Sequence, residues 1–395
     1  MSSMSSAAYL EPVSGRLYPL EQPRWCSDDG LPLLITAQKG IAVSDIDSRI
    51  RSVWRYHAAL PLHISQPISL GEGITPLVQQ TWGEHRPWFK LEWFNPTGSF
   101  KDRGTTVMLS YLRQAGITDV MEDSSGNGGA SVAGYGAAGA MKVRILAPAS
   151  TSAGKIAQVR AYGADVQLVP GSRADTEAEA IRQADQVFYA SHNWQALFLE
   201  GTKTLAYELW EDNGYRAPDN IIVPVGAGSN LLGLYFGFRE LLVAGQIRKT
   251  PRLFAAQPLN CSPVDASFRA NTGDQRDVGE TIGETIGETI SEINASPVPR
   301  PVSQTIAEGT AIAQPRRLAQ MIEALRATHG ETVAVTEQQI LTALRKSGEA
   351  GFFIEPTSAT APAALDQLIA AGTIKPAEMT VVVLTGTGLK ATAPP

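Results

Sequence analysis

A lysine follows a sharp turn in the stretch 95–104, Asn-Pro-Thr-Gly-Ser-Phe-Lys-Asp-Arg-Gly, which constrains the fold more than any other part of the chain. Pro fixes φ and Gly relaxes it, so this turn ends an extended segment. The residues from Thr105 to Gln114 predict a helix, which places Lys101 at a strand-to-helix junction. A helix N-terminus disfavours a cation, and partial burial lowers the pKa of an amine further. Such an amine can attack an aldehyde and form a Schiff base; the alternative is a solvated surface lysine.

Composition and charge fit an enzyme-sized protein without a polyanionic partner. The chain has 395 residues, 43% hydrophobic and 18% charged, which allows two or three domains or two interleaved ones. A formal net charge of −6 argues against nucleic acid and against an anionic membrane as partners. No apolar run reaches the roughly 18 residues of a membrane span, and residues 1–8 do not resemble a signal peptide. Cys26 and Cys261 form no metal-ligand pattern, so we expect free thiols, no metal site and a cytoplasmic location.

Strand-like and helical runs alternate through the middle of the chain. Apolar runs at 143–148, 165–169 and 187–190 are separated by helical runs at 152–162 and 176–186. This alternation predicts an α/β fold with a parallel sheet covered on both faces by helices. Two further apolar strands are expected at 221–225 and 380–384, and residues 11–35 predict an irregular lead-in or hairpin.

A perfect tandem repeat occupies residues 279–290, where Gly-Glu-Thr-Ile occurs three times. Glycine in every copy makes a weak helix, and the array is too short for a solenoid. We interpret the repeat as a surface insertion; a functional lid is the alternative.

Four turns lie at the carboxyl ends of predicted strands, where open α/β sheets bind ligands. Besides the lysine turn, the turn from Gly226 to Asn230 offers N–H groups at a helix N-terminus, which suits a phosphate or serves as a packing turn. In the turn 124–129, Asn127 can donate to a ring oxygen and nearby N–H groups can hold a carboxylate, unless the serines only cap a helix. Thr385 either faces a ring nitrogen or begins a turn. Together these features indicate pyridoxal phosphate (PLP) as the cofactor.

The order of the motifs resembles the fold-type II PLP enzymes, and within them threonine synthase and its close relatives. The matching motifs are Gly-Glu-Gly-x-Thr-Pro-Leu at 71–77, Pro-Thr-Gly-Ser-Phe-Lys-Asp-Arg-Gly at 96–104, Ser-x-Gly-Asn at 124–127, Glu-Gly-Thr-Lys-Thr at 200–204, Gly-x-Gly-x-Asn at 226–230, Glu-Pro-Thr-Ser-Ala at 355–359 and Leu-Thr-Gly-x-Gly-Leu-Lys at 384–390. They stand in the family's order and cover roughly residues 70–390.

The resemblance implies a fold-type II enzyme with two interleaved three-layer domains, mostly parallel sheets, and a homodimer. The implied division is a lead-in segment at 1–65, a large PLP-binding domain at 66–110 and 216–395, and a small domain at 111–215. Lys101 is implied as the Schiff-base lysine and proton shuttle, and Asn127 as the contact of the ring hydroxyl. The phosphate is assigned to Gly226, Ala227, Gly228, Ser229 and Asn230, and the pyridine nitrogen to Thr385. The substrate is assigned to Ser124, Ser125, Gly126, Gly128 and Phe198.

Two of these positions depart from the threonine synthase pattern. Gly128 stands where threonine synthases usually carry Thr, and Phe198 where they usually carry an Arg that contacts the substrate phosphate. Losing a bidentate phosphate donor weakens the case for O-phosphohomoserine. We therefore predict weak or no activity on O-phosphohomoserine and a preference for a neutral or apolar distal group, unless Lys155 or Lys203 supplies the contact from a shifted position.

The predicted reaction is a β- or γ-elimination or replacement on a small amino-acid substrate. The amino acid displaces Lys101, the freed amine removes the Cα proton, a leaving group departs, and water or another nucleophile then adds. Three functions stay open. The chain is a threonine synthase; or it is a β-replacing synthase of the cysteine or cysteate type, or a threonine or serine deaminase; or it is a non-catalytic PLP-binding protein.

Overall fold

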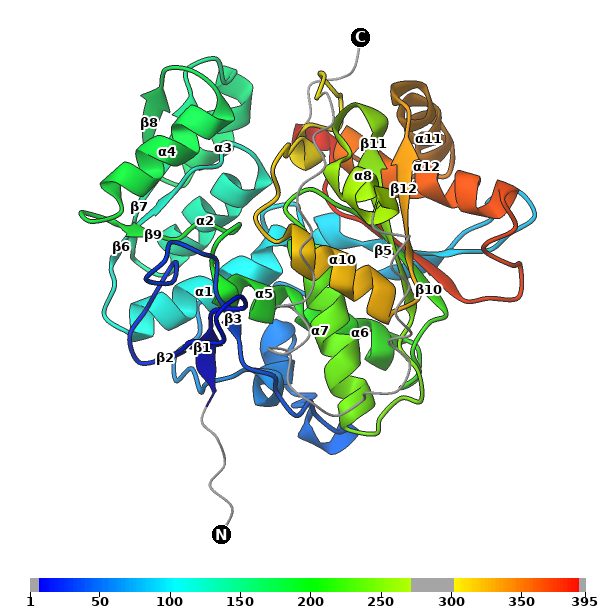
Figure 1. Ribbon diagram of the computed structural model, residues 1–395, viewed down its shortest axis with the longest axis horizontal. Coiled ribbons are helices and arrows are strands. Elements are labelled where there is room, and N and C mark those ends of the chain that lie inside the picture. Colours follow the sequence, from blue (N-terminus) through cyan, green and yellow to red (C-terminus); the bar gives the residue numbers. More distant parts are fainter. Residues whose placement is uncertain (1–6, 271–301, 391–395) are drawn as a thin grey trace.

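The computed structural model describes residues 7–270 and 302–390, so the repeat at 279–290 lies outside the described residues. Figure 1 shows two lobes, each built around its own sheet, with a short N-terminal segment against the smaller one. None of the helices within the described ranges is long and apolar enough to cross a bilayer.

The larger lobe contains a sheet of six strands in the order β12-β11-β10-β13-β5-β4. The strands are β4 (Leu77–Gln79), β5 (Trp88–Leu91), β10 (Asn220–Pro224), β11 (Arg252–Pro258), β12 (Glu331–Val335) and β13 (Thr380–Leu384). All neighbours are parallel except β4 and β5. Because β13 pairs with β5, segments that precede and follow the small lobe in the sequence join in one sheet, as the interleaved fold requires.

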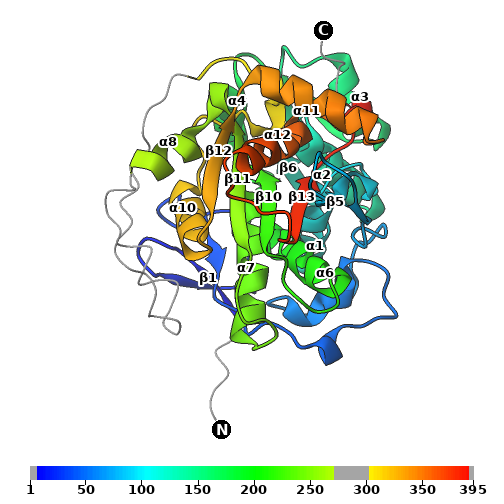
Figure 2. The same ribbon diagram turned by 90° about the vertical axis from the view of Figure 1, so that its right-hand side faces the viewer.

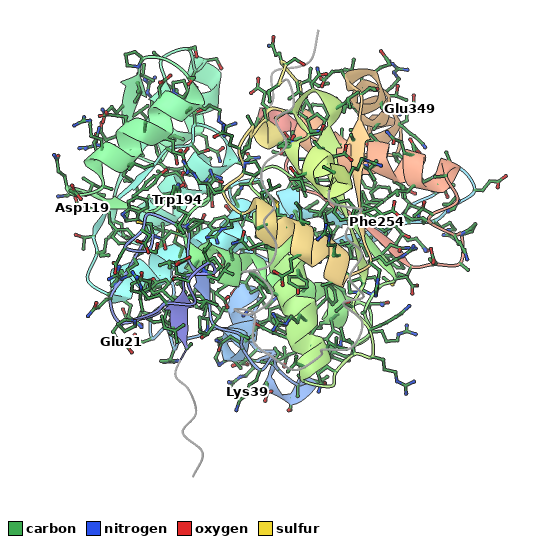
Figure 3. All side chains as sticks on the ribbon, viewed as in Figure 1. Glu21, Lys39, Asp119, Trp194, Phe254 and Glu349 are labelled. Carbon is green, nitrogen blue, oxygen red and sulfur yellow. The ribbon has the colours of Figure 1, made fainter. Side chains whose placement is uncertain are left out.

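Helices cover both faces of this sheet, which explains why its central strands are continuous apolar runs. All residues of β10 and β13 are buried. Alternate residues point to opposite faces: Ile221 and Val223 pack with α6, α7 and α10, whereas Ile222 packs with α11 and α12. The helices of this lobe are α6 (Thr204–Asp212), α7 (Ser229–Val243), α8 (Pro263–Ala270), α10 (Leu318–Ala327), α11 (Glu337–Glu349) and α12 (Pro356–Ala370). Figure 2 shows β12, β11, β10 and β13 side by side, and Figure 3 marks Phe254 of β11 inside this lobe.

The smaller lobe contains a parallel sheet of four strands in the order β8-β7-β6-β9. The strands are β6 (Asp119–Glu122), β7 (Lys142–Pro148), β8 (Asp165–Val169) and β9 (Phe188–Tyr189), and the helices around them are α1 (Lys101–Gln114), α2 (Asn127–Ala138), α3 (Ala153–Ala161), α4 (Arg173–Gln183) and α5 (Ala196–Thr202). Asp119 marks the amino end of β6, at the outer edge of the lobe in Figure 3. The carboxyl end of β6, at Glu122, therefore points toward the large lobe, and this end carries the polar turn 124–129.

The N-terminal segment is more regular than the sequence indicates. Residues 8–35 form a three-stranded antiparallel sheet of β1 (Ala8–Leu10), β2 (Leu17–Pro19) and β3 (Leu34–Ile35), in the order β2-β1-β3. Tyr9 and Tyr18 bury their rings in the core of the small lobe. The expected hairpin is therefore present as β1 and β2, and β3 adds a third strand that the sequence did not predict. Contacts to a distant part of the chain stabilise strands too short to be recognised alone.

Short 3-10 helices make several of the connections. They are η1 (Val43–Asp45), η2 (Val53–Ala59), η3 (Glu92–Phe94), η4 (Leu259–Cys261), η5 (Glu308–Thr310) and η6 (Gly388–Lys390). Two of them lie beside turns of the candidate site: η5 lies next to Gly226, and η6 lies next to Gly98.

Candidate active site

The lysine turn is docked on the end of β13. The Phe100 N–H donates to the Thr385 carbonyl over 3.0 Å, and Ser99 forms a β-bridge with Gly386. Gly98 has φ +87°, and a Cβ there would lie 3.0 Å from the Lys390 Cε. A side chain at Gly98 would therefore be strained and crowded, which explains the glycine. Helix α1 begins directly after the turn, and its first residue is Lys101.

The two residues after Lys101, Asp102 and Arg103, fix the first turn of α1 through buried hydrogen bonds. Asp102 accepts hydrogen bonds from the Thr97 N–H at 2.7 Å and the Ser131 hydroxyl at 2.6 Å. Arg103 is fully buried and donates to Glu92 at 2.7 Å and to Glu208 at 2.8 Å. These bonds satisfy charged groups within the core and hold the start of α1 rigidly.

Lys101 itself lies against two aromatic rings. Its Nζ is 4.7 Å from the centre of the Phe100 ring and 5.6 Å from that of Phe198. Burial lowers the pKa of Lys101 to about 8, although the charges of Glu122 and Glu355 act in the opposite direction. No hydrogen-bond partner of Nζ is found among the described residues. This agrees with the expectation of a lysine whose amine is available as a nucleophile.

The turn after β10 forms a cradle of backbone N–H groups. Gly228 has φ +90°, in the left-handed region, and caps α7, which begins at Ser229. A Cβ on Gly226 would lie 3.0 Å from Gly309 O, so the backbone of the neighbouring loop passes directly over this turn. Asn230 is buried, and neither its amide oxygen nor its amide nitrogen has a hydrogen-bond partner among the described residues. A helix N-terminus with an unsatisfied buried amide suits an anionic group such as a phosphate.

A polar cluster joins Asn127 to the carboxyl end of β13. The Asn127 amide donates to the Glu355 carboxylate at 2.9 Å, and its oxygen accepts from Lys390 Nζ at 3.3 Å. Burial raises the pKa of Glu355. Nearby, the Thr385 hydroxyl lies 2.9 Å from the Ser358 hydroxyl. Sequence reasoning assigned no role to Glu355, Lys390 or Ser358, although the motifs at 355–359 and 384–390 contain all three.

The turns that carry the lysine, the cradle of N–H groups and the polar cluster follow the neighbouring parallel strands β5, β10 and β13, so they gather at one edge of the large sheet. In agreement, residues 68–386 match the sequence model of a family described as pyridoxal-phosphate dependent enzyme. The chain belongs to this family. It is a PLP-dependent enzyme with the fold-type II architecture expected from its motifs.

Threonine synthases are among the most similar curated relatives. The enzyme of Methanocaldococcus jannaschii is 31% identical over 95% of this chain and 91% of its own length. The enzyme of Methanosarcina acetivorans is 30% identical over 89% of this chain and 83% of its own length. Membership of the threonine synthase-like part of the family is thereby confirmed.

Solved structures support the fold alone. A fungal L-serine ammonia-lyase from Rhizomucor miehei matches with a TM-score of 0.65 at 21% identity, over 82% of this chain and 95% of that one. Maize serine racemase matches with a TM-score of 0.64 at 20% identity, over 80% and 88%.

His192 links the two positions that depart from the threonine synthase pattern. Its ring centre lies 5.7 Å from that of the fully buried Phe198 on α5. On its other side, a Cβ on Gly128 would lie 2.6 Å from His192 Nδ1 and Cε1. The imidazole therefore fills the space that a threonine at position 128 would need. Sequence reasoning missed His192, although its place directly after the predicted strand 187–190 was a usable signal.

Three titratable groups surround this imidazole at the carboxyl end of β6. Glu122 accepts the backbone N–H of His192 at 3.0 Å, and its Oε2 lies 3.0 Å from His192 Nδ1. Burial raises the pKa of Glu122 to about 7. Burial and the charge of Glu122 raise the pKa of Asp123 to about 7 as well. Burial and the cation of Lys101 lower the pKa of His192 well below its usual value.

Neither of the two lysines considered as replacements for the missing arginine is seen to supply that contact. Lys203 is fully buried and donates to Glu200 and Glu240, so its charge is already neutralised. The side chain of Lys155 lies outside the described residues. Arg173, at the exposed start of α4, donates to the Glu308 carbonyl at 3.3 Å, and its charge helps to lower the pKa of Lys101 and of His192.

Proposed function

We propose that this enzyme catalyses elimination or replacement on an amino acid, with Lys101 as the residue that joins the cofactor aldehyde and later removes the Cα proton. The observation that carries this is a partly buried amine with a pKa lowered to about 8, held at the first residue of α1 without a hydrogen-bond partner among the described residues. A lysine of this kind is both a nucleophile and, once released, a base near neutral pH.

The remaining sequence-predicted residues fit the cofactor. The N–H groups of the turn 226–230 and the unpartnered amide of Asn230 would hold the phosphate. Asn127 would contact the ring hydroxyl, and Thr385 would face the ring nitrogen. Bound in this way, PLP supplies an electron sink for the charge that develops at Cα.

The substrate carboxylate is assigned to the turn that precedes α2. Ser124, Ser125, Gly126 and Gly128 place backbone N–H groups at a helix N-terminus, which favours an anion. Phe198 lines the distal part of the pocket. An apolar ring there leaves a phosphate dianion without its usual partner, so we infer weak activity on O-phosphohomoserine, the threonine synthase substrate.

A β-eliminating deaminase acting on serine or threonine is therefore a second candidate, and a β-replacing synthase of the cysteine or cysteate type is a third. The neutral surface made by Phe198, Gly128 and His192 favours both over a phosphorylated substrate. A non-catalytic PLP-binding protein is disfavoured by the amine of Lys101, which has no hydrogen-bond partner in the described ranges 7–270 and 302–390. We further propose a homodimer, a cytoplasmic location and the domain division at 66–110, 111–215 and 216–395.

The test combines the cofactor and the substrate. Purified enzyme is incubated with O-phosphohomoserine, O-phosphoserine, serine and threonine, and phosphate, ammonia and amino-acid products are measured. Lys101→Ala should abolish every turnover and the visible absorbance of the lysine-bound cofactor, whereas Lys142→Ala, at an exposed lysine, should change neither. Retention of that absorbance in Lys101→Ala contradicts the proposal.

A further inference from the structure

An imidazole and a carboxyl group form a buried pair beside Lys101 that the proposed roles leave unused. Glu122 is fully buried and His192 is 6% exposed. Their side chains approach to 3.0 Å, and a second bond from the His192 backbone to the same oxygen fixes the orientation. Buried ionisable groups cost free energy, so a site that brings them together without a cation in direct contact invites a chemical role.

The pair lies beside two of the residues assigned to the substrate, Gly128 and Phe198. The edge of the ring that carries Nδ1 and Cε1 rests on Gly128, in the turn assigned to the substrate carboxylate. Its face lies against Phe198, the same ring that contacts Lys101 Nζ at 5.6 Å. His192 and Lys101 therefore both lie near the Phe198 ring.

The charges around His192 come from three elements. Glu122 and Asp123 stand at the end of β6, Lys101 at the start of α1, and Arg173 at the start of α4. Nδ1 faces Glu122, and among the described residues Nε2 has no hydrogen-bond partner, so this nitrogen is available to a substrate.

We propose that the Glu122–His192 pair is the acid that protonates the leaving group, and that the substrate is consequently an amino acid that loses a hydroxyl rather than a phosphate. This rests on the proposed function. His192 is the catalytic residue, because its Nε2 touches the departing oxygen. Glu122 is a positioning residue and proton reserve that acts through the imidazole.

The step balances for a β-hydroxy amino acid. The Cα–H bond breaks, its proton goes to the Lys101 amine, and its electron pair enters a new Cα–Cβ double bond. The Cβ–O bond breaks with its electrons on oxygen, which takes the Nε2 proton of His192 while Nδ1 takes the carboxyl proton of Glu122. Water leaves, Lys101 holds one proton more and Glu122 one fewer, and proton exchange with solvent restores both.

Leaving-group chemistry separates a hydroxyl from a phosphate. Hydroxide is a poor leaving group and needs a proton in the transition state, for which a positioned acid typically contributes about 10²- to 10⁴-fold. A phosphate carries the negative charge itself and needs a cationic partner instead, which Phe198 cannot provide. The pocket thus offers a proton where the threonine synthase pattern has an arginine.

The first experiment compares two leaving groups in one variant. His192→Asn should lose about 10²- to 10⁴-fold in turnover of serine or threonine, yet change only a few-fold with β-chloroalanine, because chloride leaves without a proton. His192→Gln serves as a second variant in case the first does not fold, and His63→Asn, at an exposed histidine, is the matched control. Equal losses on both substrates would mean a structural role and would overturn the inference, as would an unchanged rate on serine and threonine.

A second readout needs no turnover. The chain has five histidines, so the ¹⁵N imidazole signals lost in His192→Asn identify His192 in the full-length protein with and without cofactor. We expect a neutral ring through neutral pH whose tautomer changes in Glu122→Gln. A ring that titrates in the ordinary range and ignores Glu122→Gln contradicts the pairing.

The two proposals fail in different ways. Wild-type enzyme that acts on β-chloroalanine, with His192→Asn unchanged on serine and threonine, overturns only the role of the pair. Wild-type enzyme that binds cofactor through Lys101 but eliminates from none of these amino acids overturns the proposed function, and with it this inference.

Discussion

Lys101 and Lys203 are both shielded from water, but their pKa values shift in opposite directions. Burial alone would lower the pKa of Lys203, but Glu200 and Glu240 bond to it directly and hold its pKa above the usual value. Burial lowers the pKa of Lys101 to about 8, and within residues 7–270 and 302–390 no carboxylate is bonded to its amine to oppose this. The same desolvation therefore produces a structural cation in one place and a reactive amine in the other, and the direct partners decide which.

The buried carboxylates repeat this contrast. Burial would raise the pKa of Glu208, but Arg103 and Lys90 bond to it and hold its pKa below the usual range. In the part of the chain that the structure describes, no lysine or arginine is bonded to Glu122, and burial raises its pKa to about 7. One region of the molecule pairs its buried carboxylate with opposite charges, whereas Glu122 is bonded by backbone N–H groups and an imidazole; shifted pKa values of this kind cluster at functional sites.

Lys101→Met should produce the largest effect. Without the amine, turnover of the best amino-acid substrate should fall by about 10⁴-fold or more. The melting temperature of the cofactor-free protein should stay the same or rise, because an unpartnered buried cation is removed. Steady-state kinetics and thermal unfolding check this; a clear fall in melting temperature would break the comparison with Lys203.

Lys203→Met should lower stability and leave activity nearly unchanged, the opposite of Lys101→Met. It leaves Glu200 and Glu240 buried without their cation, and breaking a buried pair in this way costs about 3–5 kcal/mol. Urea unfolding measures the loss, and activity per folded molecule should be nearly unchanged because Lys203 lies outside the site. Loss of activity without loss of stability would place Lys203 in the substrate pocket after all.

Phe198→Arg should move the site toward the threonine synthase pattern. A charged hydrogen bond to a phosphate contributes about 1.5–3 kcal/mol, so kcat/KM for O-phosphohomoserine should rise about 10- to 100-fold relative to that for a hydroxy amino acid. Phe198→Leu controls for the loss of the ring. If the wild type already uses O-phosphohomoserine efficiently and the arginine adds nothing, the enzyme is an ordinary threonine synthase.

Glu122→Gln should change the pH dependence of stability. With a folded-state pKa of about 7 against a usual value of 4.5, the native protein binds this proton where the unfolded chain has lost it. Stability from this group is thus present at low pH and falls as pH rises from 4.5 toward 7, by at most about 1.4 kcal/mol per unit. The variant should lose that slope in urea unfolding measured between pH 5 and pH 8; an unchanged slope would mean that Glu122 is already ionised at pH 5.

The confirmed part of the sequence reasoning rests on local patterns. The fold class followed from apolar strands such as 221–225 alternating with helices, and the cofactor from turns whose glycines and polar residues are contiguous in the chain. The roles of Lys101, Asn127, Thr385 and the turn 226–230 stay predictions, as do the domain boundaries. Lys203, one of the residues considered as a replacement for the missing arginine, is paired with Glu200 and Glu240, and the sequence could not show this because the two carboxylates come from different helices.

His192 and Glu122 were missed for a related reason. They are 70 residues apart in sequence, and only the parallel pairing of β6 with β9 brings them to 3.0 Å. The sequence by itself determined that a lysine begins a helix after a sharp turn and that a glycine-rich turn precedes another helix, because turn chemistry and strand patterning act over a few residues. Only the tertiary structure decided which buried charges meet a partner, since desolvation and Coulomb energy depend on neighbours that distant segments supply.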